Sequence, residues 1–358
     1  FTPQLMQLLK SGKAEALAGA CAALGYQGAK AGVAVELLAQ ALSDEPVVAI
    51  PASYALARIN QPAAKVMPQI LRAVLAREEE GKMRPVQQAM AFGLGYDAGR
   101  VAPLYFDGLL PSLARDGNPL EDVDRKLLHP ALVKLLGDPS GRTRGSAAYA
   151  FAHFSREDIA EMAQEIYDAV TKPAPHYRMF SDDARQQALN LLLKFRIAEG
   201  VPLALDSIDL KDWGSGDRLP HRWKILQGYG ASASPYLPQL QSLRAGFKEG
   251  SENRKAVEDT IAAIEKNGDT PALVSLHTLV DEKLAGDLAP IKNKDLEAAA
   301  CRAQIKGNPG DWFYQAACLR RLVTLQDKAA KEDVQRALES ENEILREAAE
   351  KLRTSKKW

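Results

Sequence analysis

The chain has 358 residues, and its 46 lysines and arginines balance its 46 aspartates and glutamates, so its formal net charge is zero. This balance argues against the overall positive field that draws proteins to nucleic acids or anionic membranes. No stretch reaches the ~18 consecutive apolar residues of a membrane span. We therefore expect a soluble protein, cytoplasmic or exported. Because the chain begins at Phe1 and not at Met, we also expect a trimmed precursor, a cleaved export signal or an excised piece.

Composition favours an all-helical protein. Hydrophobic residues make up 46% of the chain and aromatic residues only 6%, with abundant helix-forming Ala, Leu, Lys, Glu and Arg. Apolar residues recur at spacings of three and four along most of the sequence, which is the helical pattern. Alternating β-branched runs bounded by hairpin turns, which would indicate strands, are missing.

A Gly-Tyr step recurs in the sequence at Gly25, Gly95 and Gly228. Each step follows a helix-like run and precedes an alanine-rich stretch that leads into another apolar run. Glycine reaches positive φ at little cost and often ends helices. We therefore expect a helix to end at each of these three glycines, within an internal repeat of helix, turn and helix.

A second recurring element supports the repeat. Residues 52–57 read ASYALA and residues 147–152 read AAYAFA, each shortly after a turn that contains Asp and Pro. Alanine has the highest helix propensity and lets a neighbouring helix approach closely. Each alanine-rich run is therefore predicted to be the second helix of a hairpin.

Residues 128–154 combine an apolar helix, an Asp-Pro turn, a basic pair and an alanine-rich helix, and in this order they resemble a HEAT repeat of the short bacterial type. The resemblance covers roughly residues 13–265 at a period of about 35–40 residues. It implies an all-α fold: a right-handed α-solenoid of antiparallel helical hairpins in a single elongated array, from a bacterium.

Breaks and changes in the helical repeat pattern divide the sequence into four predicted parts. They are HEAT-like repeats (1–171), an irregular repeat with two aromatic and basic loops (172–224), further helical hairpins (225–327) and charged C-terminal capping helices (328–358). The last part contains a capping-box pattern that starts at Ser340, followed by one apolar face, as a terminal repeat requires.

The two irregular loops are the predicted binding surface, because loops on a rigid scaffold commonly carry function. Basic residues at the starts of second helices would line the concave groove. The structural alternatives are that the aromatic residues seal helix ends and that the arginines pair with Asp138 of the preceding turn. The predicted partner-binding residues are Tyr177, Arg178, Trp213, Arg222, Trp223, Arg142, Arg144 and Arg185.

No catalytic motif stands out in the sequence. The nucleophile elbow, the phosphate-binding glycine loop and the zinc-binding His-Glu-x-x-His pattern are all missing. Asp212, Asp217 and His221 could act as acids or bases, but such residues in glycine-rich loops are more often turn formers. The histidine spacing indicates no metal site, and no cofactor is expected.

The cysteines leave one question open. Cys21 lies in an alanine-rich run and is expected to be buried. Cys301 and Cys318 flank a predicted helix turn and could face each other, either as a disulfide or as two buried thiols.

We predict a non-catalytic protein-binding or scaffolding module, alone or within a larger polypeptide. The alternative is a helical-repeat enzyme, either an α/α toroid that acts on a carbohydrate or lipid or a HEAT-like DNA glycosylase. A glycosylase needs a strongly basic groove, and the neutral charge argues against one. The expected partner is a protein and not a nucleic acid, and the oligomeric state is left open.

Overall fold

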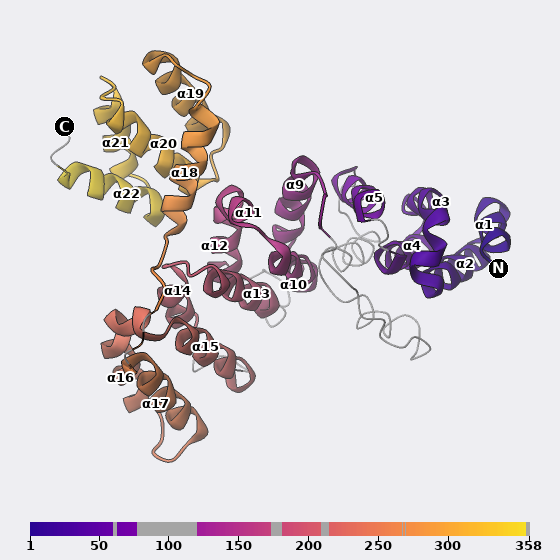
Figure 1. Cartoon of the computed structure of the whole chain (residues 1–358), viewed down its shortest axis with the longest axis horizontal. Coiled ribbons are helices and arrows are strands. Elements are labelled where there is room, and N and C mark those ends of the chain that lie inside the picture. Colours follow the sequence, from indigo (N-terminus) through magenta and orange to yellow (C-terminus); the bar gives the residue numbers. More distant parts are fainter. Residues whose placement is uncertain are drawn as a thin grey trace. The chain divides into compact units, whose positions relative to one another are not determined.

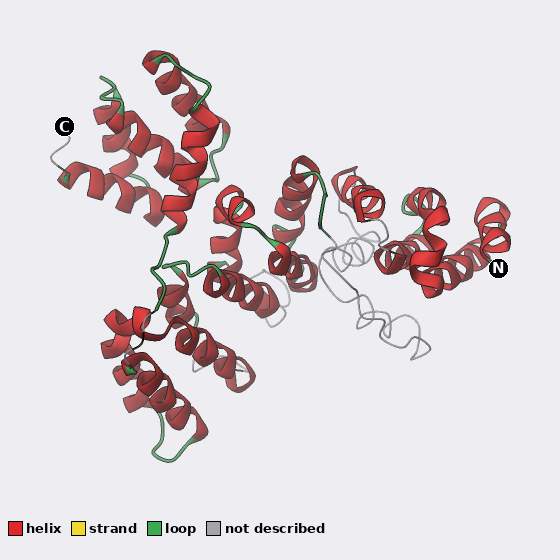
Figure 2. Ribbon diagram, viewed as in Figure 1, coloured by secondary structure: helices red, strands yellow, loops and turns green. Residues whose placement is uncertain are grey.

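The computed structural model describes residues 1–59, 63–76, 120–172, 181–208, 215–266, 268 and 270–355. These residues form helices joined by turns and loops (Figures 1 and 2). Extended pairing within this part of the chain is limited to a parallel bridge between Ile197 and Val274. The predicted all-α class is confirmed. No helix among the described residues is long and apolar enough to span a membrane.

The chain divides into two compact units. Unit 1 comprises Phe1–Phe154, Ala169–Leu191 and Asp209–His221, and unit 2 comprises Ser155–Asp168, Leu192–Ile208 and Arg222–Trp358. Three of the five limits between the units fall within α12 (Ala163–Thr171), α13 (Ser181–Lys194) and α15 (Ser215–Tyr229), and the other two fall at 154/155 and 208/209.

Unit 1 is built from short helices. In order they are α1 (Thr2–Ser11), α2 (Ala14–Gln27), the 3-10 helix η1 (Gly28–Ala34), α3 (Val35–Ala41), α4 (Pro46–Ile59), α5 (Ala63–Ala76), α9 (Arg125–Leu136), α10 (Gly141–Ala148) and the 3-10 helix η3 (Tyr149–His153).

The alanine-rich stretches lie in the core of unit 1. Residues 52–57 belong to α4 and are all buried, and α4 packs against α2. In the second copy, residues 147–152 cover the end of α10 and most of η3, with Ala147, Ala148, Ala150 and Phe151 buried. The prediction of a helical element is confirmed at both copies, although the second tightens into a 3-10 turn.

Polar side chains fix where α9 and α10 begin. The Asp124 carboxylate accepts a hydrogen bond from the Lys126 backbone at 2.9 Å. In the turn between the helices, Asp138 accepts from the backbone N–H of Ser140 at 2.6 Å. Ser140 then caps α10 by accepting from Thr143. These contacts satisfy amide groups that have no partner inside a helix.

The Gly-Tyr glycines do not have the conformation expected for them. Gly25 lies inside α2 and Gly228 inside α15, whereas the positive φ angles belong to Gly28 (54°) and Gly230 (55°). Each of these two glycines opens a 3-10 helix directly after the α-helix. The predicted turn therefore exists but comes two or three residues later, and Gly95 lies outside the described residues.

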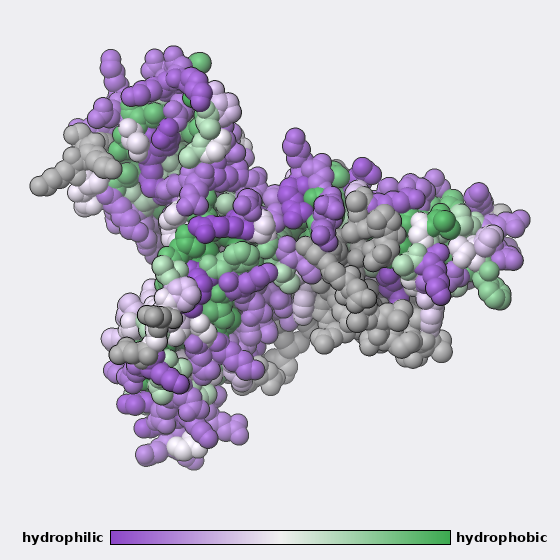
Figure 3. All heavy atoms as spheres, viewed as in Figure 1, coloured by the Kyte–Doolittle hydropathy of each residue, from purple (hydrophilic) through white to green (hydrophobic). Residues whose placement is uncertain are grey.

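Unit 2 contains the remaining helices. They are α11 (Arg156–Glu161), α14 (Gly200–Asp206), the 3-10 helix η5 (Gly230–Tyr236), α16 (Leu237–Gly246), α17 (Glu252–Glu265), α18 (Leu276–Leu288), α19 (Lys294–Gly307), α20 (Trp312–Thr324), α21 (Ala330–Leu338) and α22 (Glu343–Thr354). On the face drawn in Figure 3, the surface over α17 is mostly hydrophilic.

The last helix has the predicted single buried face, because Ile344, Ala348 and Ala349 are buried on α22. Its first residue differs from the expectation. The N-cap is Asn342, whose side chain accepts from the Leu345 backbone at 3.3 Å. The predicted capping box starting at Ser340 is therefore wrong by two residues.

Candidate functional site

Half of the predicted binding residues fall outside what the structure describes. Tyr177, Arg178 and Trp213 belong to segments 173–180 and 209–214, which are not among the described residues. Arg142 lies on α10, but its side chain is not among those described. The predicted patch can be located only through its other members.

Arg144 and Arg185 both donate hydrogen bonds to backbone carbonyls at the C-terminal end of α12. Arg144 Nη2 donates to the carbonyl of Lys172 at 2.8 Å, and Arg185 Nε donates to the carbonyl of Val170 at 2.8 Å. The last carbonyls of a helix lack partners within it and carry partial negative charge. The expected pairing with Asp138 is not found, because one oxygen of that carboxylate accepts from Ser140 and the other has no hydrogen-bond partner.

Arg222 and Trp223 are each only 2% exposed, so they do not form the exposed aromatic and cationic patch predicted from the sequence. Their burial follows from helical spacing: on α15 they lie three and four residues from the buried Leu219 and Leu226, on the same helix face. The Trp223 ring meets Phe247 edge to face, with 6.4 Å between centroids. This prediction is corrected, because the sequence pattern of α15 already favoured burial.

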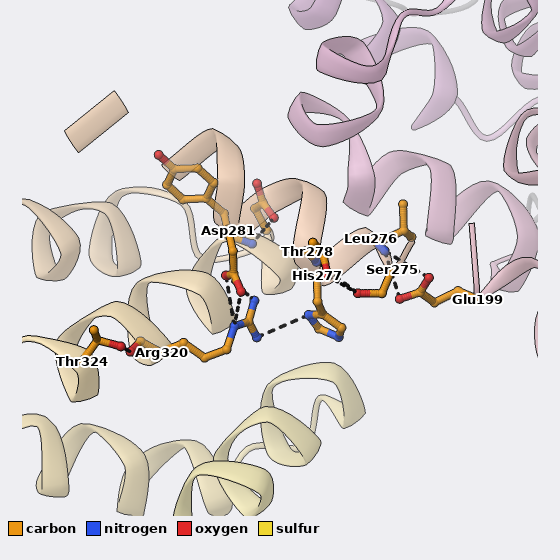
Figure 4. Close-up of polar contacts among 10 residues, drawn as sticks. Glu199, Ser275, Leu276, His277, Thr278, Asp281, Arg320 and Thr324 are labelled. Carbon is orange, nitrogen blue, oxygen red and sulfur yellow. Dashed lines mark hydrogen bonds and ion pairs between the residues drawn. The ribbon is translucent and has the colours of Figure 1, made fainter. Parts of the chain in front are cut away.

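The structure reveals a polar cluster in unit 2 that the sequence interpretation missed. We define the α18–α20 polar cluster as Glu199, His277, Asp281 and Arg320 (Figure 4). Arg320 of α20 forms a two-pronged ion pair with Asp281 of α18, with Nε–Oδ2 at 2.9 Å and Nη2–Oδ1 at 2.7 Å. Its Nη1 atom lies 3.4 Å from His277 Nδ1.

Glu199 belongs to this cluster because it caps α18 from a distant part of the chain. Its two carboxylate oxygens lie 3.1 and 3.0 Å from the backbone nitrogen of Leu276, which donates to them. Ser275 caps the same end by accepting from Thr278 at 3.0 Å (Figure 4). Burial raises the pKa of Glu199, although the helix amides oppose this effect by stabilising its charged form.

His277 is held in its neutral form. Burial, followed by the positive charges of Arg320 and Lys351, lowers the pKa of His277 to about 4. The ring also packs against Phe313, with 4.9 Å between centroids. A neutral imidazole is not a general acid near pH 7, and one of its ring nitrogens donates a hydrogen bond while the other accepts one.

A second group of titratable residues lies in unit 2 where α12 approaches the start of α20. The side chain of Gln164 links the two, because its oxygen accepts from the Trp312 backbone at 3.0 Å and its nitrogen donates to Asp168 at 2.8 Å. Burial, with smaller effects from Asp311 and other carboxylates, raises the pKa of the adjacent Glu165 to about 7.

The pKa values of His277 and Glu165 are shifted by burial, and shifted pKa values are a property of many catalytic sites. Catalysis also requires a nucleophile with its base, or a metal, in an accessible place. Arg320 joins α20 to α18, Glu199 joins the turn before α14 to the start of α18, and Gln164 joins α12 to the start of α20. Among the residues that the structure describes, no group of three or more His, Cys, Asp or Glu side chains could hold a metal ion. The described contacts of both groups serve the packing of one segment against another.

The sequence contained only part of the signal for the α18–α20 polar cluster. His277 and Asp281 stand four residues apart, so a helix places them on one face. Their partner Arg320 lies 39 residues beyond Asp281, and no local pattern shows which helix supplies it.

No protein-family model fits the chain, and no curated protein matches it. The likeness to HEAT repeats therefore depends on the chain's own motifs.

Proposed function

We propose that the chain is a non-catalytic helical-repeat module, a right-handed α-solenoid of HEAT-like hairpins that binds or scaffolds a protein partner. A rigid array of helices offers a preformed surface, so that binding does not require the receptor to fold. The observation that carries this proposal is a set of local contacts that occurs in both units.

In unit 1 the contacts surround the first Gly-Tyr step. Arg58 of α4 donates from Nε to the Gly25 carbonyl at 3.1 Å. Its guanidinium carbon lies 5.9 Å from the centre of the Tyr26 ring. The positive-φ residue Gly28 then starts η1, and α3 follows.

In unit 2 another arginine makes the same kind of contacts. Arg196 donates to the Gly228 carbonyl at 2.9 Å and to the Tyr229 carbonyl at 3.0 Å. Its guanidinium carbon lies 5.3 Å from the centre of the Tyr229 ring. The positive-φ residue Gly230 starts η5, and α16 follows. The two sets share the kinds of contact but not their order in the chain, since Arg58 lies 33 residues after Gly25 and Arg196 lies 32 residues before Gly228. Recurrence of such contacts is expected in a repeat protein, in which recurring residues serve packing between neighbours.

The arginines also support a protein partner over a nucleic acid. Arg144 is 7% exposed and Arg222 is 2% exposed, and Arg185 donates to a helix carbonyl. These three side chains belong to the predicted basic stripe, which also included Lys224, an exposed residue, and Arg142, whose side chain is not described. A groove that binds phosphates would need the stripe accessible.

Because Arg144 and Arg185 bind carbonyls at the end of α12 and Arg222 is buried, they are not proposed as binding residues. The proposed binding surface is therefore the two predicted loops, with Tyr177, Arg178 and Trp213 as its anchors. Aromatic and arginine side chains dominate the energy of many interfaces.

The first experiment identifies the partner. The full chain, used as bait in an extract of its native source, should retain a specific protein after chemical crosslinking and mass spectrometry. X-ray scattering in solution separates the proposed open array from the closed toroid of the enzyme alternative. A closed particle, or the absence of any saturable protein partner, would count against the proposal.

The second experiment locates the surface. A Tyr177→Ala, Trp213→Ala double variant should weaken binding by about 2 kcal/mol, close to thirtyfold in Kd. Leu296→Ala is the matched control, because Leu296 is 64% exposed on α19 and lies outside both loops. Equal binding by the double variant and the control would contradict this choice of surface, while circular dichroism checks that both variants keep their helices.

A further inference from the structure

Two cysteine side chains meet inside unit 2. Cys301 of α19 and Cys318 of α20 are both free and fully buried. Cys301 lies six residues before the last residue of α19, Gly307, and Cys318 lies six residues after the first residue of α20, Trp312. This equal spacing places them at the same level of the helical hairpin, and each thiol shifts the pKa of the other. The two helices pack together and are joined by the short turn 308–311. The two cysteines are unbonded in this structure and belong to neighbouring helices of one hairpin.

The surroundings of the pair allow the close approach that a disulfide requires. Ala298 on α19 and the consecutive Ala316 and Ala317 on α20 are buried beside the cysteines. Small side chains let two helices come close, and a disulfide needs Cα atoms no more than about 7 Å apart.

The two thiols differ in acidity. A hydrogen bond from the Cys318 thiol stabilises the Cys301 thiolate and lowers the pKa of Cys301, with smaller help from Arg321 and Arg302 and opposition from burial and Glu297. The same hydrogen bond, together with burial, raises the pKa of Cys318. The positive charges of Arg321 and Arg302 favour the Cys301 thiolate, and a thiolate is the form of cysteine that attacks a disulfide.

We propose that Cys301 and Cys318 form a redox-active dithiol, which closes to a disulfide between α19 and α20 by exchange with a small-molecule disulfide such as oxidised glutathione. In the first step the Cys301 thiolate attacks one glutathione sulfur, the glutathione S–S bond breaks, and one glutathione thiolate leaves. In the second step the Cys318 thiolate attacks the Cys301 sulfur and releases the other glutathione. The protein loses two protons and two electrons, and the oxidised glutathione becomes two thiols.

The test uses the full chain, unfolded and then refolded in glutathione buffers, so that burial does not limit access to the thiols. Trypsin separates the three cysteines into peptides 14–30, 295–302 and 307–320. Mass spectrometry should show peptides 295–302 and 307–320 joined by a disulfide, while Cys21 in peptide 14–30 stays a thiol. Closing the 16-residue loop 302–317 should raise the melting temperature by about 5 °C or more.

Three further samples complete the test. Chain that was never unfolded, incubated in the same buffers until the thiol count is constant, should form the same bond. Cys318→Ala should leave Cys301 with glutathione attached, and Cys21→Ala should leave the Cys301–Cys318 bond unchanged. The proposal fails if all three thiols remain free in buffers that oxidise a reference dithiol. The proposal also fails if Cys21 is oxidised to the same extent as Cys301 and Cys318, since their proximity would then not favour oxidation.

Discussion

A β-carbon added to Gly25 would lie 3.0 Å from the Cα atom of Ala55 and 3.2 Å from its β-carbon. Real β-carbons seldom come this close to another atom, so α2 and α4 meet here without a side chain on the α2 side. The glycine of the Gly-Tyr step is thus required by the approach of two helices and not by its φ angle. Ala55 belongs to the other recurring element, so the two elements contact each other at this copy, whereas a β-carbon at Gly228 would meet Leu193.

We expect Gly25→Ala to lower the free energy of unfolding by about 1–3 kcal/mol, because α2 and α4 must move apart. Gly19→Ala is the control on the same helix, since a β-carbon there meets nothing within 4 Å. The control should be neutral or stabilising by up to ~1 kcal/mol, because alanine favours helix. Urea denaturation measures both variants. Equal stability of the two would show that α2 and α4 do not pack this closely.

Gly200 is restricted by Tyr229. A β-carbon at Gly200 would lie 1.9 Å from the Tyr229 hydroxyl oxygen, which donates to the Ile197 carbonyl at 2.8 Å. We expect Gly200→Ala to destabilise the protein by about 2–3 kcal/mol, since the ring must move and its hydrogen bond is lost. Gly286→Ala, with nothing within 4 Å of the added carbon, is the neutral control.

A double-mutant cycle tests the cause of this effect. Tyr229→Phe removes the hydroxyl that the added carbon would meet first. The Gly200→Ala, Tyr229→Phe double variant should therefore lose less stability than the sum of the single variants, by about 1 kcal/mol. Strict additivity would mean that the two positions do not touch.

Glu165 should make the protein less stable as the pH rises. Its pKa of about 7 in the native state lies above the ordinary value of 4.5, mainly because of burial. Between these pH values the native state keeps a proton that the unfolded chain has released, so stability falls as pH increases through this window. As the pH rises from 4.5 to 8, the free energy of unfolding of Glu165→Gln should increase by about 2 kcal/mol relative to that of wild type. Urea denaturation across this range measures the gain, and parallel curves for variant and wild type would contradict it.

His277 should act in the opposite direction. Its pKa of about 4 in the native state lies below the ordinary value of 6.5. Between these values the unfolded chain takes up a proton that the native state does not, so stability falls as pH decreases through this window. Between pH 7 and pH 4, the free energy of unfolding should fall by about 2 kcal/mol more in wild type than in His277→Gln. Thermal unfolding at several pH values tests this, and an equal loss in both would show that the ring is solvated.

The sequence predicted the all-helical class and the recurring elements, because alanine content, helical spacing and Gly-Tyr steps are local features. It misplaced the positive φ angles, since the patterns alone do not distinguish a glycine needed for packing from one needed for a turn. Arg222 and Trp223 were assigned to the surface for their chemistry, although their spacing from Leu219 and Leu226 places them on a buried face. Arg320 and Asp281 could not be paired in advance, because their contact depends on how α18 and α20 pack.

The bridge between Ile197 and Val274 has a consequence for how a chain of this kind changes length. Ala198 donates to the Val274 carbonyl at 2.9 Å, and Val274 donates to the Arg196 carbonyl at 3.1 Å. The polypeptide thus returns, after about 75 residues, to the place that it left. Segments whose ends lie side by side tolerate insertion and exchange well, because the flanking chain keeps its neighbours whatever lies between. Within the segment between Ile197 and Val274, the exposed turn between α16 and α17 at residues 247–251 is the place where an insertion would disturb least, because the paired backbone of these two residues fixes both ends of the segment.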